Sequence, residues 1–298
     1  MNGLTSGEEV FSFCKLLVGE KAWREKNGLD SGYIDLKYRK SLFNEAGGLN
    51  NACVYGYADR LKPLVDIIKE CGGGLKILDA GCGCGSESLM MGLMNNAVVG
   101  IDLIPLRAAY ASSRIDYFNS CVGNDKIDVH FFAKNILEYL PVENTFDIIW
   151  LMESISHIHP AEKFFKKAYD SLKGNGRLII AESNSLNPVS WYRSYKIRGA
   201  ASWYVSKKFK YVDVEEHDEV AEERMFTVFD LKKLLIAAGF CIEKVHMSGF
   251  IGSNIFPKAF INNIAVSGFM QKVQKVIQKM PVLKYAGANY TIVACRKG

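Results

Sequence analysis

The stretch LDAGCGCGS at residues 78–86 places three glycines and two cysteines in the five positions from Gly81 to Gly85. It overlaps the end of the apolar run LKILDA at 75–80, so we expect it to form the turn after a strand. Glycine accepts a positive φ and lets a ligand approach the backbone without a Cβ in the way. Two interpretations are open: a glycine cradle for a ligand, or a cysteine site for a metal or for redox chemistry.

The two cysteines of this stretch do not have the spacing of a zinc site. Cys82 and Cys84 are separated by a single residue, and the chain contains no CxxC motif. No other Cys or His stands nearby at metal-ligand spacing, so the pair offers too few ligands for a closed site. The eight cysteines are scattered along 298 residues with no export signal, which indicates reduced thiols. We expect no metal, and we expect both cysteines to fill these positions because they are small.

Short apolar runs continue downstream of the glycine stretch and are separated by helix-length segments. The runs lie at 75–80, 97–102, 128–133, 146–152, 176–183, 241–247 and 290–296. The alternation of the first five with helical segments is typical of crossover units that build a parallel sheet, with helices on both faces. The predicted fold class is therefore α/β, with a doubly wound, seven-stranded, mostly parallel sheet.

The rest of the chain divides into a cap, a core and two insertions. Residues 1–70 contain amphipathic helical pieces, and we interpret them as an N-terminal helical cap on a core at 71–298. The alternation of strands and helices lapses at about 184–226 and 247–286. Loops of this length in a compact domain usually serve as lids or substrate-binding elements, so both are predicted to be lid insertions.

The composition favours a cytoplasmic protein that does not span a membrane. The chain is 49% hydrophobic and 23% charged, which is ordinary for a globular protein. It has no uninterrupted apolar window of about 18 residues, and its beginning lacks the basic start and apolar core of an export signal. The net charge of +5 is too small to indicate nucleic acid by itself. The basic charge is concentrated at 244–298, which has eight basic residues and no acidic one.

The glycine spacing excludes two common phosphate-binding loops. A dinucleotide fingerprint GxGxxG requires a third glycine where Ser86 stands, and a GxxxxGK(S/T) loop is absent. A nicotinamide-dependent oxidoreductase is therefore disfavoured. What remains is a glycine loop preceded by the acidic residue Asp79. This arrangement suits a ligand that carries a cationic group.

The stretch ILDAGCGCG at 77–85 resembles the first motif of the class I S-adenosylmethionine-dependent methyltransferases. The resemblance extends over about 75–182 and resumes at 226–240 and 290–298. It implies a Rossmann-like fold and S-adenosylmethionine as the cofactor, with the loop holding the methionine part. The implied contacts are Asp79 and the Gly81 backbone for its ammonium and carboxylate, with Cys82, Gly83 and Gly85 completing the loop.

The strand after the glycine loop supports a nucleoside site. It ends in Asp102, 17 residues after Gly85. A carboxylate can accept hydrogen bonds from both hydroxyls of a ribose, which explains an acid at this strand end. The alternative is a surface Asp at a strand terminus. The resemblance implies that Leu103 lies against the adenine ring.

After the third strand, Asn135 stands where this family often has an acid. An amide can both donate and accept hydrogen bonds, so Asn135 can pair with an adenine edge. The alternative is an Asn in a turn. Ile136 beside it and Met152 at the end of the fourth strand complete the predicted cofactor-binding set.

The segment WLMESISHIHP at 150–160 is similar to the quinone-pathway O-methyltransferases. Their pattern here is Met-Glu-x-x-Glu-His, with a metal bound by the acids and the histidine. Glu153 and His157 match it, whereas Ser156 replaces the second acid and removes one of the three ligands. On a helix Glu153 and His157 share a face, so Glu153 is predicted to orient His157 as a catalytic general base without a metal. The alternative is a packed histidine at a helix start.

Two features bear on the acceptor. Methyltransferases that act on base amino groups commonly carry an Asn/Asp-Pro-Pro-aromatic motif after the fourth strand, where this chain has LMES at 151–154, so nucleic acid is disfavoured as a partner. The first insertion mixes aromatic with basic residues, and such a mixture can bind RNA, an anionic small molecule or a membrane surface. Its aromatic residues are Trp191, Tyr192, Tyr195, Trp203 and Tyr204.

The second insertion contains the amphipathic stretch GFMQKVQKVIQKMP at 268–281. Its helical spacing predicts a lid helix packed on the domain. The alternative is a peripheral membrane contact through this basic C-terminal part. One face has Phe269, Met270, Val273, Val276, Ile277 and Met280, and another has Lys272, Lys275 and Lys279.

Together these features predict an S-adenosylmethionine-dependent methyltransferase that modifies an oxygen, nitrogen or carbon of a small-molecule or lipid-like acceptor. Two alternatives stay open: a methyltransferase of RNA or protein, and a non-catalytic protein that binds S-adenosylmethionine. The sequence predicts no oligomeric state.

Overall fold

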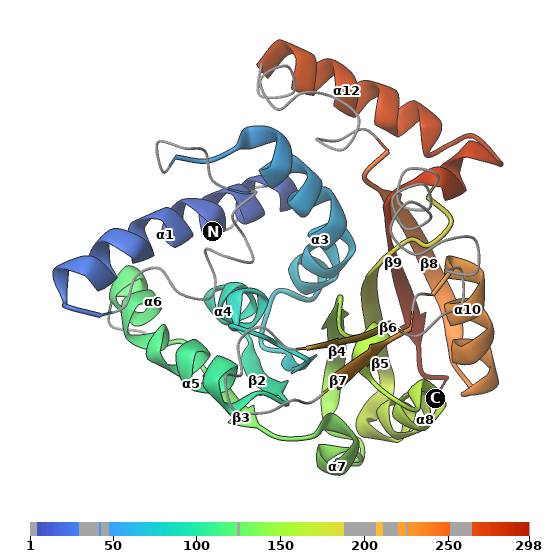
Figure 1. Cartoon of the computed structure of the whole chain (residues 1–298), viewed down its shortest axis with the longest axis horizontal. Coiled ribbons are helices and arrows are strands. Elements are labelled where there is room, and N and C mark those ends of the chain that lie inside the picture. Colours follow the sequence, from blue (N-terminus) through green and yellow to red (C-terminus); the bar gives the residue numbers. More distant parts are fainter. Residues whose placement is uncertain are drawn as a thin grey trace.

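The computed structural model describes residues 5–29, 42, 48–123, 126–187, 207–210, 220–224, 226–250 and 264–297. Its centre is a seven-stranded sheet with the order β3-β2-β1-β4-β5-β9-β8 (Figure 1). The strands are β1 (Lys76–Ala80), β2 (Ala97–Asp102), β3 (Val129–Ala133), β4 (Phe146–Met152), β5 (Leu172–Ser183), β8 (Cys241–Ser248) and β9 (Asn289–Cys295). The pairs from β3 to β5 are parallel, and β9 runs antiparallel to both β5 and β8. The predicted seven-stranded, mostly parallel sheet is confirmed.

The strand order creates a ligand site in the middle of the sheet. The chain starts at β1, adds β2 and β3 on one side, and then returns to add β4 on the other side of β1. The connections that leave β1 and β4 therefore diverge, and doubly wound sheets bind ligands in the crevice at such a point. The loop at 81–85 and Glu153 directly follow these two strand ends.

Successive side chains of the central strands point to opposite faces of the sheet and pack into two separate apolar cores. Ile77 and Ile148 belong to one cluster of buried residues, and their neighbours Leu78 and Ile149 belong to the other. Because both faces of these strands are buried, their sequences are continuous apolar runs rather than alternating ones.

Helices cover both faces of the sheet (Figure 1). One core contains apolar side chains of α1 (Ser6–Lys26), α3 (Asn51–Cys71), α4 (Ser86–Leu93) and α6 (Ile115–Val122). The other contains those of α7 (Ile136–Tyr139), α8 (Ala161–Ser171) and α10 (Val228–Ala237). α5 (Pro105–Ser113) follows β2 and packs on β2 and β3.

The N-terminal helices share a core with the sheet. α3 ends at Cys71, next to the predicted boundary at residue 70, where Gly72 supplies a left-handed cap. Leu61 and Leu64 of α3 are buried in the same cluster as Ile77 of β1. The helices α1 and α3 thus form one layer of the fold, and the division into a cap and a core stays a prediction.

The described parts of the two insertions contain regular structure. The first has a separate two-stranded antiparallel sheet of β6 (Lys207–Lys210) and β7 (Val220–Glu223), which the sequence patterns do not predict. Its aromatic residues Trp191, Tyr192, Tyr195, Trp203 and Tyr204 lie outside the described residues. The second insertion has α12 (Ile264–Ile277) and a short three-ten helix, η4 (Leu283–Ala286).

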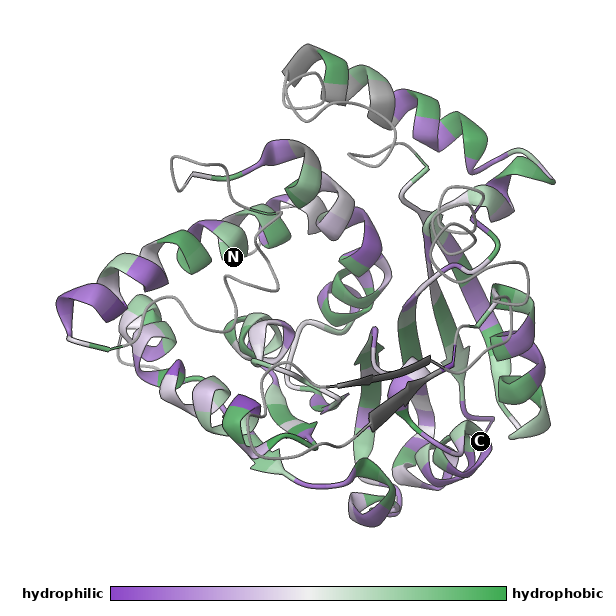
Figure 2. Ribbon diagram, in the orientation of Figure 1, coloured by the Kyte–Doolittle hydropathy of each residue, from purple (hydrophilic) through white to green (hydrophobic). Residues whose placement is uncertain are grey.

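The predicted amphipathic helix of the second insertion is present, but it begins and ends four residues earlier than the predicted stretch at 268–281. α12 ends at Ile277, so Met280 lies beyond it. Phe269 and Val276 are exposed, and Figure 2 shows hydrophobic and hydrophilic residues mixed along the helix. None of the helices in the described ranges is long and apolar enough to cross a membrane.

Two glutamines hold the C-terminal part of this insertion helix to the rest of the fold. Gln274 Nε2 donates to Asp59 Oδ2 in α3 at 2.5 Å. Gln278 Nε2, just after the helix, donates to the Met247 carbonyl in β8 at 2.7 Å. The helix is thereby fixed at the end nearer the sheet.

Candidate functional site

The loop at 81–85 leaves β1 and leads into α4. All three of its glycines have a left-handed backbone, with φ of 81° at Gly81, 54° at Gly83 and 77° at Gly85. Other residue types rarely adopt this conformation, which explains the alternating glycines. The sequence thus folds into a tight turn at the carboxyl edge of the sheet, in which Gly81 and Gly83 are partly exposed.

The three glycines differ in what a Cβ would meet. At Gly81 it would lie 2.5 Å from the Cβ of Ser154, and at Gly85 it would lie 2.5 Å from the ring of Phe131. Both positions are therefore closed by packing inside the protein. At Gly83 a Cβ would meet no atom within 4 Å. Gly83 faces open space at the end of β1, where a ligand can touch the backbone.

Asp102 joins the end of β2 to this loop. Its Oδ2 accepts from the Gly83 N–H at 2.8 Å, and its Oδ1 accepts from the Ile104 N–H at 2.9 Å. Each carboxylate oxygen has a second lone pair, so the group can also accept hydroxyl groups of a ribose. Burial raises the pKa of Asp102 above its ordinary value, although both backbone hydrogen bonds act to lower it. Asp102 therefore holds the loop in place in addition to being a candidate ligand contact.

The predicted adenine contacts flank Asp102. Leu103 is 55% exposed, which leaves an apolar surface beside the carboxylate. Asn135 is the N-cap residue of α7, and its Oδ1 accepts from the Leu137 N–H at 2.9 Å. Ile136 is buried at the start of that helix. The Asn135 oxygen thus has a local structural role, and a contact of its amide group with adenine stays a prediction.

Asp79 is buried in β1, and its Oδ2 accepts from the Ser88 hydroxyl at 2.6 Å. Ser88 belongs to α4, so this bond ties the strand before the loop to the helix after it. Gly81 and Gly83 are partly exposed. The exposed surface of the loop at Gly81 and Gly83 therefore consists of backbone atoms. A contact of the buried Asp79 carboxylate with an ammonium group stays a prediction.

Cys82 and Cys84 are buried within the loop. Burial, followed by the negative charges of Asp79 and Asp102, raises the pKa of the Cys82 thiol well above its ordinary value. The thiol is protonated at neutral pH, whereas a reactive or metal-binding cysteine is a thiolate. Within the part of the chain that the structure describes, no three His, Cys, Asp or Glu side chains are grouped to hold a metal ion.

The end of β4 differs from the prediction. The strand ends at the half-buried Met152, and Glu153 turns away with a left-handed φ of 52°. The next residues form a short three-ten helix, η2 (Ile155–His157). Glu153 and His157 therefore do not share a helical face, and the predicted helical pairing of the two is wrong. The cause is the turn at Glu153, which places it outside the helix.

Glu153 points toward α3 instead. Its Oε1 accepts from Arg60 Nη1 at 2.7 Å and from the Ser183 hydroxyl at 3.3 Å. The next residue, Ser154, donates its hydroxyl to the Ala80 carbonyl at 2.7 Å. The end of β4 is thus tied to both α3 and the start of the glycine loop.

His157 is within electrostatic range of the cofactor side of the site. Burial has the largest effect on the pKa of Asp102, and His157 is one of the groups whose charge lowers it. The neighbouring Ser156 is buried, and its carbonyl accepts from the Arg224 N–H at 2.8 Å. The first insertion therefore contacts the segment that carries His157.

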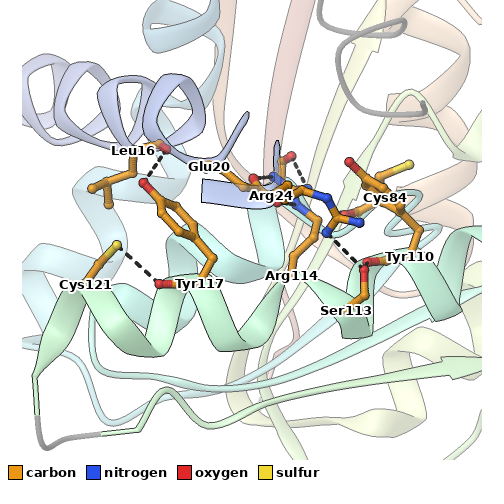
Figure 3. A network of polar contacts seen from close by, with 10 residues as sticks. Leu16, Glu20, Arg24, Cys84, Tyr110, Ser113, Arg114, Tyr117 and Cys121 are labelled. Atoms are coloured by element: carbon orange, nitrogen blue, oxygen red, sulfur yellow. Dashed lines mark hydrogen bonds and ion pairs between the residues drawn. The ribbon is translucent and has the colours of Figure 1, made fainter. Parts of the chain in front are cut away.

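A buried arginine that the sequence patterns do not predict braces the loop (Figure 3). Arg114, between α5 and α6, is fully buried. Its Nη1 donates to the Cys84 carbonyl at 2.7 Å and to the Ser86 hydroxyl at 2.8 Å. Its Nε and Nη2 donate to the two carboxylate oxygens of Glu20 in α1, at 2.8 and 2.7 Å. Arg114 therefore connects the glycine loop to the first helix.

Three further contacts dock α1 beside this arginine (Figure 3). Arg24 Nη1 donates to the Ser113 hydroxyl at 3.2 Å, and its guanidinium carbon lies 4.8 Å from the centroid of the Tyr110 ring. The Tyr117 hydroxyl donates to the Leu16 carbonyl at 2.8 Å. No local pattern marks these partners, because 89 to 101 positions separate the hydrogen-bonded residues.

Known proteins resemble the part of the chain that forms this site. Residues 77–176 match the family model described as a methyltransferase domain. The chain is 27% identical over 124 residues to the mitochondrial ubiquinone biosynthesis O-methyltransferase of Schizosaccharomyces pombe, covering 41% of this chain and 43% of that protein. It is 30% identical over 156 residues to phosphoethanolamine N-methyltransferase 1 of Triticum aestivum, covering 51% of this chain and 30% of that protein. The matches span less than half the length of each relative.

A solved structure shows the same fold over most of the chain. The magnesium protoporphyrin IX methyltransferase of Synechocystis PCC 6803, solved with bound SAH, aligns with a TM-score of 0.53 at 15% identity. The alignment covers 88% of this chain and 93% of that one. The segment 77–176 contains the glycine loop, Asp102 and the end of β4. The chain thus matches a methyltransferase domain at residues 77–176, and its fold is that of a solved methyltransferase.

Proposed function

We propose that this chain is an enzyme that transfers a methyl group from S-adenosylmethionine to a small-molecule or lipid-like acceptor. The observation that carries the proposal is the open space at Gly83, whose N–H is hydrogen-bonded to Asp102 at the next strand end. A ligand that lies against this backbone has a carboxylate beside it, which suits a ribose with two hydroxyl groups.

Each part of the site has a binding role in this proposal. Asp102 accepts the ribose hydroxyls with the lone pairs that its backbone hydrogen bonds leave available. The exposed Leu103 packs against the base. The backbone of Gly81 and Gly83 lines the methionine part. Arg114 holds the loop in position from the side of the first helix.

When bound, S-adenosylmethionine supplies a methyl group on a positively charged sulfur. Transfer is an in-line displacement, so the main tasks of the chain are to align the acceptor and to exclude water. His157 takes the proton as general base where the acceptor is a hydroxyl, whereas a free amine needs no base. In this proposal Glu153, which accepts a hydrogen bond from Arg60 Nη1, lies on the acceptor side and does not orient His157.

The names of the relatives support a small acceptor. They describe an O-methyltransferase of ubiquinone biosynthesis and an N-methyltransferase of phosphoethanolamine. A cytoplasmic location and a peripheral membrane contact of α12 are further parts of the proposal. The support for the membrane contact is that Phe269 and Val276 are exposed on a helix that also exposes Lys272 and Lys275.

Calorimetric binding of S-adenosylhomocysteine tests the site. We expect Asp102→Ala to weaken binding by about 100-fold, because hydrogen bonds to a charged group contribute about 1.5–3 kcal/mol each. Asp116→Ala, at an exposed position of α6, is the matched control and should bind as the wild type does. Normal binding by a folded Asp102→Ala variant contradicts the assignment of the site.

A further inference from the structure

A buried cation lies beside the end of β4. Arg60 is in the middle of α3, and its side chain is 8% exposed. Its Nη1 donates to Glu153 Oε1 at 2.7 Å. Its Nε and Nη2, in contrast, are buried and have no hydrogen-bond partner in the described part of the chain.

The Nε and Nη2 atoms carry the parallel N–H groups with which an arginine binds both oxygens of one carboxylate or phosphate. In this protein Arg114 uses the same two atoms for Glu20, at 2.8 and 2.7 Å. In Arg60 they remain available, because Nη1 alone contacts Glu153. Buried polar groups in folded proteins are nearly always hydrogen-bonded, so these two N–H groups indicate a missing partner.

The neighbouring acids do not supply that partner. Glu153 is the carboxylate within ion-pair distance of Arg60 among the residues that the structure describes, and it contacts Nη1. Glu182 is buried at the end of β5, where its Oε1 accepts from the Ser183 N–H at 2.9 Å. In the same described part, no ion pair joins Glu182 to Arg60.

Arg60 is linked to the glycine loop through the end of β4. Its partner Glu153 directly precedes Ser154, whose hydroxyl donates to the Ala80 carbonyl at the start of the glycine loop. The Cβ of Ser154 also lies 2.5 Å from the position that a Cβ at Gly81 would take. The guanidinium therefore contacts the residue that precedes this link between β4 and the loop.

Arg60 is also held on rigid elements beneath the second insertion. Its carbonyl accepts from the Thr291 hydroxyl at 2.9 Å, which fixes α3 on β9. The preceding Asp59 contacts His246 Nε2 in β8 at 3.0 Å and Gln274 Nε2 in α12 at 2.5 Å. An anchor for a substrate needs this kind of fixed position.

We propose that Nε and Nη2 of Arg60 bind an anionic group, a carboxylate or a phosphate, on the methyl acceptor. This inference rests on the proposed function, and it narrows the acceptor to small molecules that carry an acidic group. The Glu153 side chain is 55% exposed, so it can swing into solvent as the anion enters. The negative charge of the acceptor then balances the positive charge of the Arg60 guanidinium in place of Glu153.

The charge of the methylated product tests this inference. The full-length protein is incubated with methyl-labelled S-adenosylmethionine and the small-molecule fraction of a cell extract, and the products are passed over anion and cation exchangers. We expect the label on the anion exchanger; phosphatase treatment releases it if the group is a phosphate and leaves it bound if the group is a carboxylate. A labelled product in which mass spectrometry finds neither a carboxylate nor a phosphate contradicts the inference alone, whereas the absence of any labelled small molecule contradicts the proposed function as well.

Substitutions of Arg60 separate acceptor binding from folding. We expect Arg60→Lys, which keeps the charge but loses the parallel N–H pair, and Arg60→Gln to raise the KM for the acceptor fraction at least about tenfold. Affinity for S-adenosylhomocysteine should stay unchanged in both. Lys62→Gln, at an exposed position of the same helix, is the matched control and should keep the wild-type KM.

Two results overturn the inference. One is a wild-type acceptor KM in Arg60→Lys. The other is a loss of S-adenosylhomocysteine affinity that matches the loss of activity, since this pattern marks a structural role. If Arg60→Gln does not fold, as judged by circular dichroism, Arg60→Lys alone decides between these outcomes.

Discussion

Arg114 and Glu20 form a two-pronged ion pair inside the protein, with Nε–Oε1 and Nη2–Oε2 distances of 2.8 and 2.7 Å. Both side chains are buried, and Arg114 also donates to the Cys84 carbonyl. The pair spans 94 positions of the chain. It joins the first helix to the glycine loop, so α1 is a support of the loop rather than a separate appendage.

Removal of the Glu20 charge should weaken both the fold and the loop. In Glu20→Gln the Arg114 guanidinium stays buried without a counter-charge, which should lower the free energy of unfolding by about 3–5 kcal/mol. Urea unfolding measures this loss, and calorimetry with S-adenosylhomocysteine measures the weaker binding that accompanies it. Glu25→Gln, in the exposed pair Lys21–Glu25, is the control and should cost less than about 1 kcal/mol. Equal effects of the two substitutions contradict the role of the buried pair.

Alanine at Gly83 and at Gly85 should have different consequences. At Gly83 the methyl enters open space, so folding loses only the strain of a left-handed residue, about 1–2 kcal/mol. At Gly85 it collides with the Phe131 ring as well. We expect Gly83→Ala to unfold cooperatively but to lose S-adenosylhomocysteine binding, and Gly85→Ala to lose more stability, both measured by thermal unfolding with and without ligand. Normal binding by Gly83→Ala would place the ligand elsewhere.

Asp102 should make the stability of the free protein depend on pH. Because burial raises the pKa of this carboxyl above 3.8 in the folded state, the folded chain takes up a proton more readily than the unfolded chain. The stabilising contribution of this group therefore increases as the pH falls through the pKa of the folded state. It reaches its full size below the pKa of the unfolded chain. Asp102→Asn removes this contribution. The unfolding free energy of the wild type minus that of the variant should therefore increase as the pH is lowered from about 7 to about 4. A difference that stays constant, or that moves the other way, contradicts the raised pKa.

Cys82 should be an unreactive thiol. Its raised pKa keeps it protonated at about pH 8, whereas Cys71 and Cys121 are exposed and should react with iodoacetamide. Peptide mass spectrometry after brief labelling measures the three rates in the protein without ligand. Labelling of Cys82 as fast as Cys71 would mean that the loop opens, and would restore a redox role for its cysteines.

Local sequence patterns predict most of the sheet because each strand is marked by its own residues. The apolar run 97–102 coincides with β2, and the run 75–80 differs from β1 by one residue. The hairpin of β6 and β7 has no such mark, because its strands KKFK and VAEE are largely charged. The backbone register pairs Lys207 with Glu223 and Lys208 with Glu222.

The candidate site likewise contains residues that the sequence predicts and residues that it does not. Gly83 and Asp102 are predictable because Asp102 is the last residue of β2 and Gly83 belongs to the loop that follows β1. Arg60 and Arg114 are not, since each acts on a residue more than 90 positions away. The helical pairing of Glu153 with His157 failed because a spacing of four residues implies a shared face only on a helix, and the backbone at Glu153 is left-handed.

Methylation of a small molecule with S-adenosylmethionine is the central claim, and its most direct test is the destination of the methyl group. The purified protein is mixed with methyl-labelled S-adenosylmethionine and a cell extract, and the label is counted in the small-molecule, lipid and macromolecular fractions. We expect label in the small-molecule or lipid fraction, formed together with S-adenosylhomocysteine and lost with Gly83→Ala. Label confined to RNA or protein, or no formation of S-adenosylhomocysteine with any fraction, contradicts the claim.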